Sequence, residues 1–144
     1  MSDIIARCGF KCNLCLIYRD NLKKDEQNRQ RFRDGLEKYY GDKLTLEECY
    51  CDGCMTDDSE NPVRITSDCK VRPCVLARGI ENCACCDQYP CQDVEKKFIE
   101  RRKVEEKYGA PIPEEDYKLF IMPYESRQVL DKIRQKRSRN DTFR

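Results

Sequence analysis

Twelve cysteines in a chain of 144 residues that contains no histidine are the feature that most limits what this sequence can fold into. Without histidine the chain cannot build a Cys2His2 zinc finger, a histidine-ligated haem, a Cys-His nucleophile pair or a Ser-His-Asp triad. A metal site here has to be built from sulfur, with carboxylate as the other available protein ligand. We therefore predict thiolate metal sites, and we assign no catalytic residues.

The apolar core that this sequence can build is small. Leu, Ile, Val and Phe make up 29 of the 144 residues, and charged residues make up 38%. Highly charged chains with so few large apolar side chains are often disordered, because ordering costs roughly 1–2 kcal/mol of backbone entropy per residue. The sequence therefore predicts a small metal-stabilised domain in which bound metal offsets part of that cost.

The cysteines also bear on the compartment. Residues 1–10 lack the apolar stretch of a secretory signal, and no apolar run reaches the length of a membrane span. In a cytosolic chain, dense cysteine indicates metal or redox chemistry more often than a disulfide framework. We therefore expect a cytoplasmic protein with no membrane contact.

The spacing of apolar residues predicts helices at both ends of the chain and irregular structure between them. Residues 49–91 hold nine of the cysteines among Gly, Pro, Asn and Asp, without a sustained helical or strand period, and we interpret them as loops wrapped round metal. Gly41 and Gly109 are expected to end helices. The predicted helices cover 13–22, 25–40, a stretch after Cys91 to Tyr108, 113–120 and 125–136.

The predicted fold class is mainly α with irregular cysteine-rich loops. We assign residues 1–100 to a cysteine-rich metal-binding domain with a helical insertion near 13–40, and residues 101–144 to a helical C-terminal extension with a basic tail. The formal charge of +1 counts thiols as neutral, and three four-thiolate sites would bring it to about −5. We therefore expect no specific nucleic-acid binding, although the tail from Arg134 carries Lys136, Arg137, Arg139 and Arg144.

The first cysteine group is Cys8-x3-Cys12-x2-Cys15. Its spacing matches the cluster motif of radical S-adenosylmethionine enzymes. The alternating strands and helices that carry that motif are not predicted here, which argues against that function.

The second group runs Cys51-x2-Cys54-x14-Cys69-x4-Cys74, and its first half resembles a zinc ribbon. Gly53 within this turn can adopt a positive φ and let backbone N–H groups point at sulfur. The third group contains the adjacent pair Cys85 and Cys86, which cannot both easily face one ion, so one of the two is expected to be spare.

These motifs together resemble the DUF3795 family of prokaryotic cysteine-rich proteins, whose function is unknown. The resemblance covers about residues 8–100 and includes Cys8-Gly-Phe-Lys-Cys12, Cys51-Asp-Gly-Cys54, Cys69-Lys-Val-Arg-Pro-Cys74 and Tyr89-Pro-Cys91. The family pattern has ten cysteines and lacks Cys49 and Cys85, which are therefore weaker candidates. The predicted metal ligands are Cys8, Cys12, Cys15, Cys51, Cys54, Cys69, Cys74, Cys83, Cys86 and Cys91.

Thiolate-only sites bind both zinc and iron-sulfur clusters. The Cys-x2-Cys pairs and the Gly53 turn favour zinc, and the usual ferredoxin spacings are absent, so we predict two or three zinc ions with an iron-sulfur cluster as the alternative. For function we predict a structural or partner-binding module with an unknown protein partner. The alternative is an iron-sulfur or thiol redox protein or enzyme.

Overall fold

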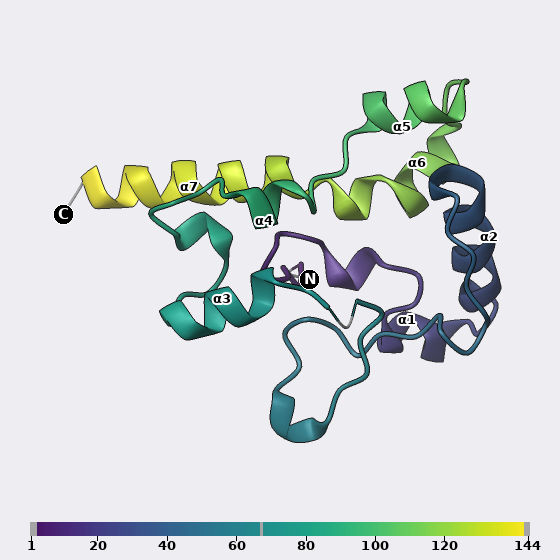
Figure 1. The fold of residues 1–144 in the computed structure, drawn as a ribbon, viewed down its shortest axis with the longest axis horizontal. Coiled ribbons are helices and arrows are strands. Elements are labelled where there is room, and N and C mark those ends of the chain that lie inside the picture. The colour runs from purple at the N-terminus through teal and green to yellow at the C-terminus, as the bar shows by residue number, and fades with distance from the viewer. Residues whose placement is uncertain (1–2, 67, 143–144) are drawn as a thin grey trace.

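Short helices separated by turns and extended segments make up the chain (Figure 1). The computed structural model describes residues 3–66 and 68–142. Within those ranges there is no strand, and the only β-type pairings are two isolated bridges, Ile5 with Lys11 and Tyr18 with Cys51. The predicted mainly α fold with irregular cysteine-rich loops is therefore confirmed. The 3-10 helices (η) and α-helices are η1 Cys12–Leu14, α1 Arg19–Lys24, α2 Asn28–Tyr40, η2 Asp58–Glu60, α3 Val71–Arg78, η3 Cys83–Cys85, α4 Gln92–Glu95, α5 Arg101–Tyr108, α6 Glu114–Phe120, η4 Met122–Tyr124 and α7 Ser126–Thr142.

Helix α2 follows the sequence pattern closely. It ends at Tyr40, and Gly41 takes the left-handed conformation with φ of 73°, as expected of a C-terminal cap. Its buried face contains Phe32, Gly35 and Tyr39. This face packs against α5 and α6. A helix with one buried face shows a periodic pattern of apolar residues, and that pattern was enough to predict α2 from the sequence.

The helix predicted over residues 13–22 is wrong for most of its length. After the short turn η1 the backbone is extended at Tyr18, and α1 begins only at Arg19. The N–H of Cys51 donates to the carbonyl of Ile17, and the N–H of Arg19 donates to the carbonyl of Cys51. This pairing with a distant segment replaces the hydrogen bonds that a continuous helix would have made.

The helix predicted between Cys91 and Tyr108 is divided into α4 and α5. Val94 of α4 is buried in one core cluster, whereas Val104 of α5 is buried in the other. The chain between them is extended at Glu100, because it crosses from one cluster to the other.

Helix α3 lies inside the segment that was predicted to be all loop. Pro73 sits in its first turn, where a proline does not remove a helical hydrogen bond, and Gly79 caps its C-terminus with φ of 66°. Val71 and Val75, one turn apart, are buried. These short signals were present in the sequence, but the surrounding cysteines hid them.

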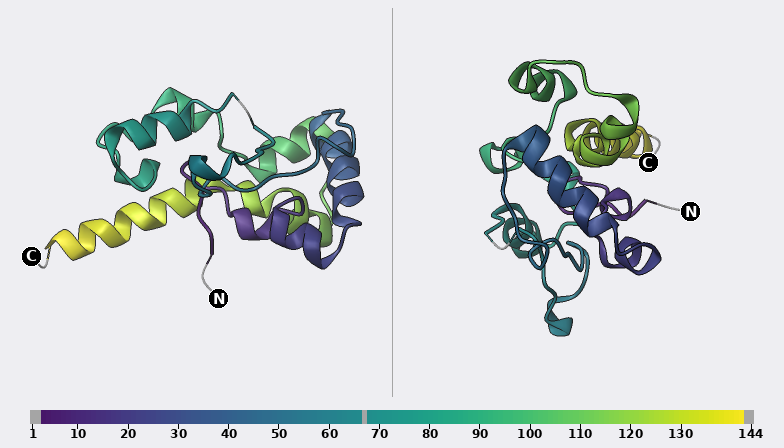
Figure 2. Two further views of the ribbon diagram at one scale, coloured as in Figure 1. Left: turned by 90° about the horizontal axis from the view of Figure 1, so that it is seen from below. Right: turned by 90° about the vertical axis from the view of Figure 1, so that its right-hand side faces the viewer.

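Two apolar clusters hold the structure together. The first lies among α2, α5 and α6, and the second lies among α3, η3, α4 and α7 (Figures 1 and 2). Both clusters contain residues from either side of residue 100, including Val104 in the first and Leu130 in the second. The two predicted parts of the chain therefore share their cores, and the division at residue 100 stays a prediction.

Helix α7 covers the cysteine-rich loops before it projects past the rest of the chain (Figure 2). Arg134, predicted to begin a solvated tail, instead donates from Nη1 to the carbonyl oxygens of Ala84 and Cys86 at 3.0 and 2.9 Å. Lys136 and Arg137 are exposed, as expected of a tail. The side chains of Arg139 and Arg144 lie outside the part of the chain that is described.

Replacing Leu130 with alanine should lower the free energy of unfolding by about 2–5 kcal/mol, because Leu130 is 0% exposed and its loss leaves a cavity under α7. The control is Leu76→Ala on α3, where the side chain is 42% exposed and the change should stay within about 0.5 kcal/mol. Urea denaturation at a fixed metal concentration measures both. Equal losses would contradict the role of Leu130 in joining α7 to the core.

Candidate metal centre

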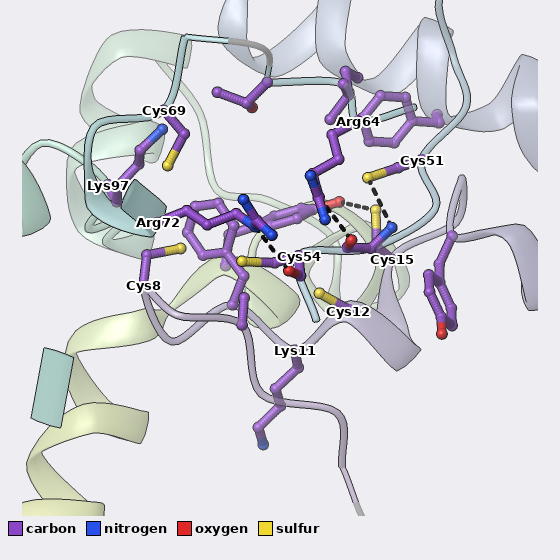
Figure 3. A pocket seen from close by; sticks show the side chains of 18 residues that line it. Cys8, Lys11, Cys12, Cys15, Cys51, Cys54, Arg64, Cys69, Arg72 and Lys97 are labelled. Atoms are coloured by element: carbon purple, nitrogen blue, oxygen red, sulfur yellow. Dashed lines mark hydrogen bonds between the residues drawn. The ribbon is translucent and has the colours of Figure 1, made fainter. Parts of the chain in front are cut away.

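Six cysteines from three parts of the chain line one cavity of about 140 Å³ (Figure 3). They comprise the whole first group and, from the second group, the Cys51–Cys54 turn and Cys69. The lining is mostly apolar apart from the thiols and a few basic side chains. The cavity brings together cysteines that lie up to about sixty positions apart in the sequence: Cys8, Cys12, Cys15, Cys51, Cys54 and Cys69.

The N-terminal loop brings the first group to the cavity through two tight turns. Gly9 has φ of 96°, and a Cβ there would lie 2.8 Å from Leu130 Cγ and 2.9 Å from Ser126 Cβ, so a glycine is required for α7 to approach. The turn η1 then begins at Cys12 and is closed by the N–H of Cys15, which donates to the carbonyl of Cys12. Both turns aim sulfur into the same space.

The Cys51–Cys54 turn has the expected knuckle shape. Gly53 has φ of 94°, and a Cβ there would lie 2.8 Å from the ring of Tyr18. The N–H of Gly53 donates to Cys51 Sγ at 3.4 Å, and the N–H of Arg7 donates to Cys54 Sγ at 3.4 Å. Such N–H groups favour the thiolate form of cysteine.

Two arginines clamp the loop that carries this turn. Arg64 donates to the carbonyl oxygens of Gly53 and Thr56, and Arg72 donates to the carbonyl of Cys54. Both also form ion pairs with Asp58, at 3.4 and 2.8 Å. The clamp fixes the knuckle and brings two positive charges to the edge of the cavity (Figure 3).

Burial dominates the acid-base behaviour of the three thiols of the first cysteine group. It raises the pKa of Cys8 and of Cys12 to about 12, and that of Cys15 to about 11. Neighbouring thiols add to the shift: Cys54 and Cys69 act on Cys8, while Cys54, Cys15 and Cys51 act on Cys12. Without a cation these groups are therefore neutral thiols, and a bound metal would displace their protons.

Tyr124 lies against the thiol of Cys15. Its hydroxyl oxygen is 3.0 Å from Cys15 Sγ, and burial raises the pKa of Tyr124 well above its usual range. The tyrosine therefore keeps its proton and can donate it to a thiolate at Cys15.

The other four ligand candidates meet around a second, much smaller cavity of about 20 Å³. Cys74 comes from α3, where Arg78 one turn later donates to its sulfur at 3.3 Å. The remaining three follow in the chain, and burial raises the pKa of Cys83 to about 12, with further contributions from neighbouring thiols. The four cysteines are Cys74, Cys83, Cys86 and Cys91.

The two cavities share a repeated turn that was not identified from the sequence. Cys12-x2-Cys15-x2-Tyr18 and Cys83-x2-Cys86-x2-Tyr89 both begin with a 3-10 turn. In each, the N–H of the second cysteine donates to the carbonyl of the first at 3.1 Å, and the tyrosine N–H donates to the carbonyl of the second cysteine. The Cys-x2-Cys-x2-Tyr spacing was the signal that could have revealed it.

The structure distributes the second cysteine group differently from its order in the sequence. Of the set Cys51, Cys54, Cys69 and Cys74, the first three line the large cavity and the last lines the small one, although Cys69 also contributes to raising the pKa of Cys83 in the small cavity. Cys69 precedes the helix and lines the large cavity, whereas Cys74 lies within the helix and lines the small one. Spacing along the chain could not show on which side of an unpredicted helix each thiol would fall.

Cys49 and Cys85 line neither cavity. Cys49 is 0% exposed and packs in the first apolar cluster. Cys85 Sγ lies 3.9 Å from Asn82 Oδ1. That these two cysteines are the weaker ligand candidates stays a prediction.

The sulfur atoms surround their cavities without converging on a point. Within residues 3–66 and 68–142, no three Cys, Asp or Glu side chains are arranged to hold one ion as they stand. A cysteine carries its sulfur on one rotatable bond, so a change of rotamer moves the sulfur while the backbone stays in place. All twelve cysteines are free thiols, and ten of them line these two cavities.

Comparison with known proteins gives a family match. The profile described as "Protein of unknown function (DUF3795)" matches residues 4–96, which include all twelve cysteines. No curated protein and no solved structure matches the chain. Among the residues described, no helix has both the length and the apolar character needed to cross a bilayer.

Replacing Tyr124 with phenylalanine should cost about 0.5–1.5 kcal/mol of unfolding free energy, because the ring stays packed while the hydrogen bond to Cys15 is lost. Tyr108→Phe is the control, since Tyr108 is 38% exposed and its change should be within about 0.5 kcal/mol. Chemical denaturation of the two variants tests this. Indistinguishable stabilities would show that the hydroxyl contributes nothing at Cys15.

Proposed function

Because the chain belongs to the DUF3795 family, a family of unknown function, we propose its function from the chemistry of its own residues. It binds metal through two separate groups of cysteine thiolates, and zinc is the metal that these groups suit best. The protein acts as a metal-stabilised structural or partner-binding module.

The division of ten cysteines between two cavities is the observation that carries this proposal. The large cavity is lined by six thiols and the small one by four. Four thiolates are the usual complement of a structural zinc site. Packing alone does not require so many thiols in two places, because a cysteine contributes less apolar area than the leucine or valine it replaces.

The turns around the sulfurs favour zinc. Both Cys51 and Cys86 accept a hydrogen bond at 3.4 Å from the N–H two residues later, donated by Gly53 and Gln88 respectively. Backbone N–H groups aimed at sulfur stabilise a thiolate that is bound to metal. The cysteine spacings also differ from those of ferredoxins.

An iron-sulfur protein is the second candidate, and the breadth of the large cavity favours it. Its sulfurs surround about 140 Å³ without converging on one point. A cluster of several metal and sulfide atoms would occupy such a space more fully than one ion. Anaerobic purification followed by metal and sulfide analysis and a visible spectrum separates the two candidates.

As a structural module the protein would work in a reducing compartment such as the cytoplasm, where its thiols remain available to metal. Every site would then be closed by protein ligands, which leaves no position for a substrate. The surfaces of the helices remain for contact with a protein partner. We expect no specific binding to nucleic acid and no contact with a membrane.

The protein as isolated should contain two or three metal equivalents and should lose cooperative unfolding when a strong chelator removes them. Each structural site is expected to contribute about 10 kcal/mol or more of folding free energy at neutral pH. Elemental analysis and thermal melts of holo and chelated, reduced protein provide the test. Full helicity and an unchanged melting transition after metal removal would contradict the proposal.

Replacing Cys74 with serine should remove about one metal equivalent, because three thiolates then remain around the small cavity. The matched control is Cys85→Ser, which changes a cysteine in the neighbouring turn outside both cavities and should keep the full metal content. Native mass spectrometry counts the bound ions in each variant. Equal loss from both would make Cys85 a ligand.

A further inference from the structure

At one end of the large cavity, three sulfurs face one another. The sulfurs of Cys8 and Cys54 point toward each other, and that of Cys69 lies on the same side of the cavity and points toward Cys8 (Figure 3). The same three thiols interact electrostatically, since Cys54 and Cys69 both act on Cys8. Lys97 lies at this end and also acts on Cys8.

At the other end, Cys15 and Cys51 lie beside Cys12 (Figure 3). Cys12 interacts with both of these thiols, and also with Cys54. The six sulfurs therefore form two groups of three, one at each end of the cavity. Cys12 of one group interacts with Cys54 of the other, so these two cysteines lie between the groups.

Six thiolates are too many for one tetrahedral ion and too few for two ions with separate ligands. Two four-coordinate ions can be satisfied by six thiolates if they share two of them, as in zinc modules with two ions and six cysteines. Two such ions would need ligands around both of them, and the six cysteines line the cavity from end to end (Figure 3).

We propose that the large cavity holds two divalent zinc-like ions that share the thiolates of Cys12 and Cys54, an inference that rests on the metal-binding function proposed above. Cys8 and Cys69 complete the ligands of one ion, and Cys15 and Cys51 complete those of the other. Each thiol gives up its proton to solvent as it binds. With one further ion in the small cavity, the ten cysteines would hold three ions.

The charges around the cavity agree with this arrangement. Two divalent ions and six thiolates carry about −2 in total. Arg64, Arg72 and Lys97 line the same cavity, and the two arginines are held in place by backbone carbonyl groups. Asp58 offsets part of the arginine charge through its ion pairs. The surroundings therefore supply positive charge where the buried cluster needs it.

The direct test uses the unmodified chain loaded with isotopically enriched cadmium, which binds thiolates as zinc does and is visible by NMR. Three cadmium signals are expected. Two of them should be split by coupling to each other through the shared sulfurs, and the third, from the small cavity, should be a single line.

A matched pair of variants provides a second test by native mass spectrometry of the zinc-loaded protein. Cys54→Ser removes a shared thiolate and should lose two ions, whereas Cys69→Ser removes an unshared one and should lose one. Cys74→Ser should leave the pair in the large cavity intact. If Cys54→Ser does not fold, the cadmium spectrum of the unmodified chain decides the question.

The possible outcomes separate this inference from the proposed function. Two bound ions without cadmium coupling, or three uncoupled signals, would overturn the shared cluster and leave metal binding standing. Iron with inorganic sulfide in the large cavity would do the same. A folded chain that binds no metal would overturn both. Equal ion losses from Cys54→Ser and Cys69→Ser would overturn the assignment of Cys54 as a shared ligand.

Discussion

Cysteine side chains do part of the packing in the second core cluster that leucine and valine do in most domains. Cys8 and Cys83 are buried within it, and four partly buried cysteines pack against it: Cys12, Cys54, Cys69 and Cys91. A neutral thiol packs as a small apolar group, but a thiolate in the same place needs a cation. Burial raises the pKa of Cys8 and Cys83 to about 12, so the metal-free core would be packed with neutral thiols. The stability of the fold and the chemistry of the site therefore depend on the same atoms.

The C-terminal helices complete a site whose cysteines all lie in the family-matched region, residues 4–96. Leu130 of α7 contacts the Gly9 turn between Cys8 and Cys12, and Arg134 binds the carbonyl of Cys86. Tyr124 reaches Cys15 from the segment between α6 and α7. Since residues beyond the matched region position cysteines in both cavities, these helices belong to the structure that forms the proposed metal sites.

The success of sequence-based prediction varied with the range of the interactions involved. Helix α2 was predicted well because its periodicity and the Gly41 cap are local signals. The helix predicted over 13–22 failed because backbone pairing of Ile17 and Arg19 with Cys51 replaced local hydrogen bonds. Helix α3 was missed even though Pro73 and Gly79 stand where a short helix would put them. The first failure therefore came from partners distant in the sequence, whereas the second came from local signals that the surrounding cysteines hid.

By itself, the sequence determined the chemistry of this protein: twelve cysteines and no histidine leave sulfur as the dominant ligand, and the Cys-x2-Cys spacings and Gly53 define the turns that present it. Only the tertiary structure decided which thiols share a cavity. Cys69 and Cys74 are five residues apart, but the start of α3 directs them to different cavities, while Cys8 and Cys54 meet from distant segments. Local spacing sets the shape of a turn, but the packing of helices against one another sets which turns face each other.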